Sequence, residues 1–210
     1  MPVARHMRPN RNTRPEYVAA FREIVNRIAR TLTELPKRAL PIRMYVAGGA
    51  ALHMYTAERV SRDINAMFSH RIALPENLEV AYRDADGSAR LLYFDRQYND
   101  MFGLMHEDAQ DDSVPLTLEG VDSGILEVRL LSALDLAVSK IGRFASPDRE
   151  DIATLARHKL INSAQLRQRA EDAAVGYVGD TTRLRGSIDL AVRIVADIES
   201  RGGKDHSGPG

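Results

Sequence analysis

Two neighbouring stretches decide how the chain folds: residues 44–54 (MYVAGGAALHM) and residues 59–68 (RVSRDINAMF). The first combines an apolar strand, a paired-glycine turn and the start of an alanine-rich helix. The second alternates as a strand does, which places Asp63 and Asn65 on the same face. A glycine turn at a helix N-terminus offers unpaired N–H groups to an anion such as a triphosphate. Two oxygen-bearing side chains beside it are suited to a hard divalent cation.

These stretches resemble the minimal nucleotidyltransferases, and more narrowly the AbiEii-type and related proteins, many of which are toxins of bacterial toxin–antitoxin pairs. The pattern of that family is a hydrophobic strand, Gly-Gly or Gly-Ser, a short helix, and then Arg-x-[Ser/Thr]-x-Asp-x-Asp. Here it reads Gly48-Gly49 followed by residues 59–65 (RVSRDIN). One departure matters, because Asn65 occupies the position of the family's second metal-binding Asp.

The resemblance extends to residues 91–99 (LLYFDRQYN) and to residues 134–152, so that it covers roughly residues 44–155. It implies that Asp95, which ends a predicted strand, is the third metal ligand beside Asp63 and Asn65. The implied metal is Mg²⁺ or Mn²⁺, and the implied substrate is an NTP.

The same resemblance gives roles to other polar residues. Gly48 and Gly49 would hold the phosphates, while Ser61 and Arg62 belong to the nucleotide site. Lys140 would meet the triphosphate as a point charge. Arg143 would either do the same or pair with Asp148, and Asp151 would brace Lys140 or Arg143.

The effect of Asn65 can be weighed physically. Its amide oxygen can coordinate Mg²⁺, but one negative charge is lost from a site that depends on charge. Three interpretations stay open: a natural substitution that weakens or repurposes the site, an engineered inactivation, or an asparagine that is tolerated because Asp63 and Asp95 suffice.

Composition limits the class of protein. The 210 residues hold 29 Lys+Arg and 29 Asp+Glu, so no global positive charge indicates nucleic-acid binding. There is no cysteine, which excludes disulfides and thiolate metal sites. No apolar run reaches the roughly 18 residues of a membrane helix, and the basic N-terminus lacks the apolar segment of a secretory signal. A soluble cytoplasmic protein is expected.

The periodicity predicts an α+β fold, with a mixed sheet, flanking helices and a helical C-terminal region. A helix is expected over residues 13–35, with Thr13 as its N-cap and Glu16 closing a capping box. Further strands are expected at 78–82, 90–95 and 125–131, with a turn at 84–87. Helices should begin at Ser132, Ser146-Pro147, Asn162-Ser163 and Thr181 or Thr182. The predicted domains are a disordered segment (1–12), a nucleotidyltransferase-like domain (13–131), a helical region (132–200) and a disordered tail (201–210).

The main hypothesis is therefore a toxin that transfers a nucleoside monophosphate from an NTP to a macromolecular hydroxyl, with the tRNA 3′ end as acceptor and a cognate antitoxin as partner. The alternatives are transfer to a protein hydroxyl (AMPylation) or to a small molecule, or a degenerate nucleotidyltransferase fold that only binds. The sequence leaves the oligomeric state open.

Overall fold

A computed structural model describes residues 6–98 and 103–204 of the chain. These form two compact units, which are described separately. The first contains Met1–Asn99 and Asp112–Leu131, and the second contains Asp100–Asp111 and Ser132–Gly210. Among the described residues, none of the helices is both long and apolar enough to cross a membrane.

The first unit is built on a six-stranded mixed sheet with the order β3-β4-β2-β1-β6-β5. β1 pairs antiparallel with β2 and parallel with β6, while β2 pairs parallel with β4. The remaining pairs, β3 with β4 and β5 with β6, are antiparallel. The strands are β1 (Ile42–Ala47), β2 (Asp63–Phe68), β3 (Glu79–Arg83), β4 (Ala89–Phe94), β5 (Val114–Pro115) and β6 (Leu126–Leu130).

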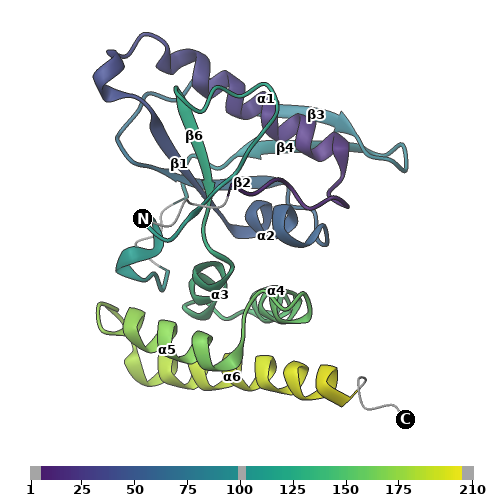
Figure 1. Ribbon diagram of the computed structural model, residues 1–210, viewed down its shortest axis with the longest axis vertical. Coiled ribbons are helices and arrows are strands. Elements are labelled where there is room, and N and C mark those ends of the chain that lie inside the picture. The colour runs from purple at the N-terminus through teal and green to yellow at the C-terminus, as the bar shows by residue number, and fades with distance from the viewer. Residues whose placement is uncertain (1–5, 99–102, 205–210) are drawn as a thin grey trace. The chain divides into compact units, whose positions relative to one another are not determined.

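Two helices cover one face of this sheet (Figure 1). α1 (Pro15–Leu32) lies along β3 and β4, and α2 (Gly48–Thr56) packs on β1 and β2. The ring of Tyr17 on α1 meets the ring of His53 on α2 edge to face, with centroids 4.7 Å apart, so both helices lie on the same side. The core beneath them is apolar and closed, since Phe21, Ile64 and Leu92 have no exposed surface.

The second unit is helical. α3 packs against α4 and α5, and α6 packs against α4 and α5. The segment at residues 103–111 belongs to this unit and lies against α3, where a Cβ on Gly142 would stand 3.0 Å from the backbone nitrogen of Leu104. The helices are α3 (Ala133–Ile141), α4 (Ser146–Arg157), α5 (Ser163–Ala174) and α6 (Thr181–Lys204).

The predicted α+β class is confirmed by this mixed sheet and its helices. The predicted strands are also present. β3, β4 and β6 have bounds shifted by one residue, whereas β1 begins at Ile42, two residues before Met44, and β2 begins only at Asp63, four residues after the predicted start at Arg59. The short edge strand β5 was not predicted, because two residues carry no readable period.

Helix starts were predicted less well. The prediction of a capping box at Thr13 and Glu16 was wrong: α1 begins at Pro15, its N-cap is Arg14, and no side chain caps it. Proline suits the first helical position because it lacks an N–H there. α4 likewise begins one residue earlier than predicted, with Ala145 as N-cap. The predicted caps Ser132 and Asn162 are confirmed.

The ends of the chain differ from the expectation of disorder where they are described. Met7 forms a bridge with Leu116, and its N–H donates to the carbonyl of Pro115 at 2.8 Å. Asn10 donates to the carbonyl of Met54 at 2.8 Å. α6 continues to Lys204, while residues 1–5 and 205–210 lie outside the described part of the chain.

Candidate functional site

The paired-glycine turn connects β1 to α2. Gly48 opens the helix with φ of +64°, a left-handed conformation that favours glycine. A Cβ at this position would stand 2.6 Å from Nδ2 of Asn65. The turn can therefore approach β2 closely only because Gly48 has no side chain.

Gly49 makes room for a second contact with the same strand. A Cβ on Gly49 would stand 2.8 Å from the hydroxyl oxygen of Ser61, which is buried beneath it. That hydroxyl donates to Oδ1 of Asp63 at 2.6 Å. Ser61 thus fixes the Asp63 carboxylate beside the N-terminus of α2.

Asn65 lies two residues along β2 from Asp63, on the same face and opposite Ala47 of β1. Its side-chain oxygen is buried and has no hydrogen-bond partner among the described residues. A buried amide oxygen without a donor is costly, so this atom is a position where a cation or a donor group would be stabilised.

Asp95 reaches the same place from β4. Its N–H donates to the carbonyl of Ile64 at 3.0 Å, which continues the β2–β4 ladder and sets Asp95 beside Asn65. One carboxylate oxygen of Asp95 accepts from the N–H of Gln97 at 2.9 Å. The sheet therefore brings together six of the residues predicted for the nucleotide and metal site: Gly48, Gly49, Ser61, Asp63, Asn65 and Asp95.

The oxygens at this position fit a hard divalent cation in chemical type, because carboxylates and an amide carbonyl are the ligands that such ions prefer. Within the described ranges, no group of three or more His, Cys, Asp or Glu residues could hold a metal ion. Of the three oxygen-bearing side chains, Asp63 and Asp95 are carboxylates and Asn65 is an amide.

Two arginines precede Asp63. The guanidinium of Arg59 lies 3.8 Å from where a Cβ on Gly49 would stand. Arg62 is exposed, and its carbonyl accepts from the N–H of Tyr93 at 2.9 Å. The Arg62 side chain thus extends from the start of β2 toward solvent.

Lys140 and Arg143 belong to the second unit, where both are paired with carboxylates of α4. Lys140 is only 10% exposed, and its Nζ lies 2.7 Å from Oδ2 of Asp151 and 3.9 Å from Oδ1 of Asp148. Arg143 donates twice to Asp148, at 2.8 and 2.7 Å. Burial opposes ionisation of Asp148, but the Arg143 hydrogen bonds and the Ala145 N–H outweigh it and hold its pKa below the usual range.

Of the two roles left open for Arg143, the structure therefore shows pairing with Asp148, and Asp151 braces Lys140. The triphosphate role of Lys140 stays a prediction.

A further ion pair of this unit was missed. Arg169 on α5 donates to both oxygens of Asp135 on α3, at 2.7 and 3.0 Å. Asp135 lies in the stretch that resembles the family's second signature, and nothing in the local sequence pointed to a partner on α5.

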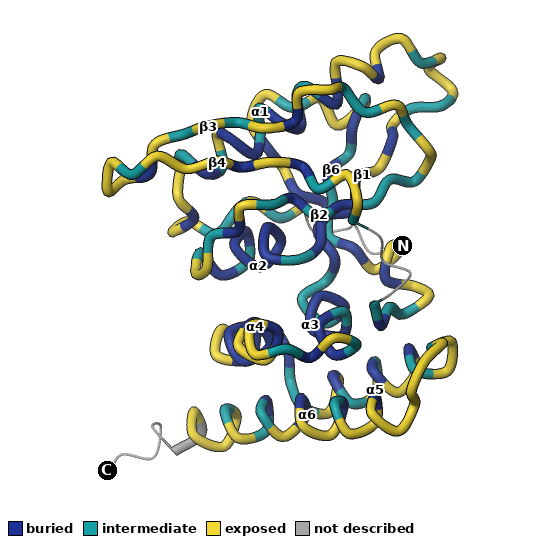
Figure 2. The backbone as a smooth tube through the Cα atoms, turned by 180° about the vertical axis from the view of Figure 1, so that it is seen from behind, coloured by how far each residue is buried: buried dark blue, intermediate teal, exposed yellow. Residues whose placement is uncertain are grey.

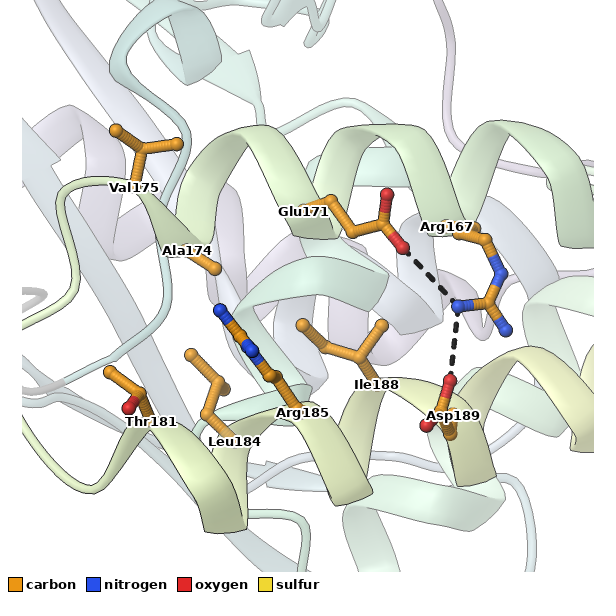
Figure 3. A pocket seen from close by; sticks show the side chains of 9 residues that line it. All are labelled: Arg167, Glu171, Ala174, Val175, Thr181, Leu184, Arg185, Ile188 and Asp189. Carbon is orange, nitrogen blue, oxygen red and sulfur yellow. Dashed lines mark hydrogen bonds and ion pairs between the residues drawn. The ribbon is translucent and has the colours of Figure 1, made fainter.

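A hollow of about 450 Å³ lies between α5 and α6 (Figure 3). Leu184 and Ile188 form part of its apolar lining, and Arg167 bridges Glu171 and Asp189 at its rim. None of the residues predicted for the nucleotide site lines this hollow.

Comparison with known families gives a match over residues 23–186 to the family described as "Nucleotidyltransferase of unknown function (DUF6036)". Comparisons with curated proteins and with solved structures gave no match. The family match runs from within α1 to within α6, so it includes the glycine turn, β2, β4 and the Lys140 helix. The chain therefore belongs to this family of nucleotidyltransferases.

Proposed function

We propose that the protein transfers a nucleoside monophosphate from an NTP to an RNA hydroxyl, with Mg²⁺ held at Asp63, Asn65 and Asp95. The observation that carries this proposal is the convergence of these three oxygen-bearing side chains beside the glycine turn. Family membership supports the class of reaction.

This proposal gives each part of the site a defined task. The first N–H groups of α2 bind the triphosphate, and the two glycines let it approach the strand. Ser61 keeps Asp63 oriented through its hydrogen bond. A bound Mg²⁺ would neutralise phosphate charge and lower the pKa of the attacking hydroxyl.

Asn65 makes this a weak form of the site. A carboxylate at that position would add one negative charge next to Asp63, where a dication gains most from it. We propose that the present chain transfers nucleotides slowly and that an aspartate restores the faster reaction.

The biological setting rests on the AbiEii resemblance. It suggests a toxin that modifies the 3′ end of tRNA in the cytoplasm and is controlled by a cognate antitoxin. The chain itself has equal numbers of acidic and basic side chains, so RNA binding would depend on local groups at the site.

The test measures Mg²⁺-dependent incorporation of each labelled NTP into total tRNA by the unaltered chain, Asn65→Asp and Asp63→Asn. We expect Asn65→Asp to be at least ~10-fold faster than the unaltered chain, because a metal-bridging charge is gained. Asp63→Asn should be silent. Equal rates for the unaltered chain and Asn65→Asp would show that two carboxylates suffice.

Label on total protein instead of tRNA would favour AMPylation. Silence from all variants, with no heat of NTP binding by calorimetry, would contradict the enzyme proposal and favour a fold that serves only for binding.

A further inference from the structure

An aromatic side chain stands exposed next to the candidate metal ligands. Tyr93 of β4 is the register partner of Asp63 of β2, so the two side chains leave the sheet on the same face. Neighbouring strands are about 4.8 Å apart, so the side chains of Tyr93 and Asp63 are adjacent on this face of the sheet.

This face differs from the opposite one, which α1 covers. Tyr93 is 42% exposed and Leu91, two residues earlier, is 43% exposed, whereas Leu92 between them is fully buried. Figure 2 shows long exposed stretches along the β3–β4 hairpin. These two large side chains at alternate positions of β4 therefore leave a flat, partly exposed surface on this face of the sheet.

A hollow of about 400 Å³ borders this surface, lined in part by Tyr93, Leu78 and Arg96. The Arg96 guanidinium donates to the carbonyls of Pro75 and Glu76, the latter at 2.9 Å. Both of these bonds go to main-chain oxygens, and they hold the guanidinium in place. Glu76 and Glu79 also line this hollow, so the ligand feature that it favours is the planar face of a ring that can stack on Tyr93, and not a phosphate.

The sheet order separates the two flanks of β2. The glycine turn, which would hold the triphosphate, follows β1 on one flank, and Tyr93 lies in β4 on the other. In phosphoryl transfer the attacking and leaving oxygens lie roughly in line on opposite sides of the phosphorus. If the leaving pyrophosphate faces the β1 flank, the attacking hydroxyl arrives from the β4 flank.

We infer that Tyr93 is the stacking platform for the terminal base of the polynucleotide acceptor, with Leu91 extending the platform along β4. This inference rests on the proposed function, because it takes the direction of attack from it. Base stacking on an aromatic side chain tolerates different bases, so the site would recognise a single-stranded nucleotide end and not a particular sequence.

The test uses the absence of tryptophan from the chain. In Tyr93→Trp the indole is the only tryptophan and reports directly on stacking through its fluorescence. Val178→Trp is the matched control, since Val178 is 96% exposed and lies in the second unit. The probes are a short single-stranded oligoribonucleotide, the same oligomer with an abasic 3′ end, and each NTP with Mg²⁺.

We expect the intact oligoribonucleotide to quench Tyr93→Trp, and the abasic oligomer and the NTPs to leave its emission unchanged. Quenching by an NTP alone would overturn the inference, because the base of the nucleotide substrate would then occupy Tyr93. Equal quenching of Val178→Trp, or no quenching of Tyr93→Trp, would overturn it as well.

This measurement needs no turnover, so it separates the two proposals. Quenching without any nucleotide transfer would contradict the proposed chemistry and leave the stacking site standing. Where transfer is measurable, Tyr93→Ala should raise the KM for the acceptor by about 10-fold or more and leave the KM for the NTP unchanged. Tyr93→Phe should retain the acceptor KM of the unaltered chain.

Discussion

Two glycines, Gly48 and Gly49, determine how closely α2 can approach β2. Gly49 stands over the buried Ser61, which in turn holds Asp63. Because Gly49 has no Cβ, Ser61 can pack beneath it and orient the Asp63 carboxylate through its hydrogen bond. Substitutions at this glycine should act on stability and on the site together.

Gly49→Ala should lower the free energy of unfolding by about 1–3 kcal/mol, because the new Cβ overlaps the Ser61 hydroxyl. Urea unfolding followed by circular dichroism measures this change. Gly186→Ala is the control: Gly186 lies in α6 with open space around it, so alanine should stabilise by about 0.5–1 kcal/mol. A neutral Gly49→Ala would show that Ser61 can shift without cost.

At this scale the sequence predicted the shared face of Asp63 and Asn65, because a strand's period is a local property. The proximity of Asp95 followed from the family resemblance and from its place at a strand end. The exposure of Tyr93 and the unpaired Asn65 oxygen could not be predicted, since both depend on which strand pairs with β2 and in what register.

Elements were predicted to different degrees for a similar reason. Strands and helices follow from hydrophobic periods, whereas their first residues depend on a few hydrogen bonds. α6 does begin at Thr181, but its capping carboxylate is Asp180, which accepts from the N–H groups of Thr182 and Arg183 at 3.0 Å. Threonine and aspartate are both common caps, so the sequence pattern cannot choose between adjacent ones.

A buried ion pair joins Lys140 of α3 to Asp151 of α4, and variants of it test how much it contributes to holding these helices together. Asp151→Ala should lower the free energy of unfolding by about 3–5 kcal/mol, because Lys140 loses its nearest carboxylate in a buried place. The double variant Lys140→Met/Asp151→Ala should lose much less, since the lysine charge is removed together with its nearest carboxylate. Urea unfolding of both variants and of Lys140→Met completes the cycle, and additive losses would contradict this account.

For the whole molecule, buried titratable groups link stability to pH. Burial lowers the pKa of His53 below its ordinary value of 6.5, so the folded chain keeps this ring neutral while the unfolded chain takes up a proton. The pKa of Asp148 is also lowered in the folded state. Both groups thus stabilise the fold above their unfolded pKa values, and this contribution is lost as pH falls.

The free energy of unfolding should therefore decrease first as pH falls below about 6.5, through His53, and again below about 4, through Asp148. Unfolding in urea across this range measures the profile. His53→Asn, which can keep a donor near the carbonyl that Nδ1 now contacts, should flatten the first decrease. An unchanged slope in that variant would assign the decrease to other groups.

The position of β6 has a consequence for how the chain is made. β1 lies in the middle of the sheet, yet its parallel partner comes much later, as the Arg43–Glu127 pair shows with a separation of 84 residues. Until β6 has been synthesised, the edge of β1 that β6 covers in the folded protein has unpaired N–H and C=O groups. This edge can pair with a strand of another chain. A nascent chain that stalls before residue 126 would present this edge, so we expect chaperones to bind it at that stage of synthesis.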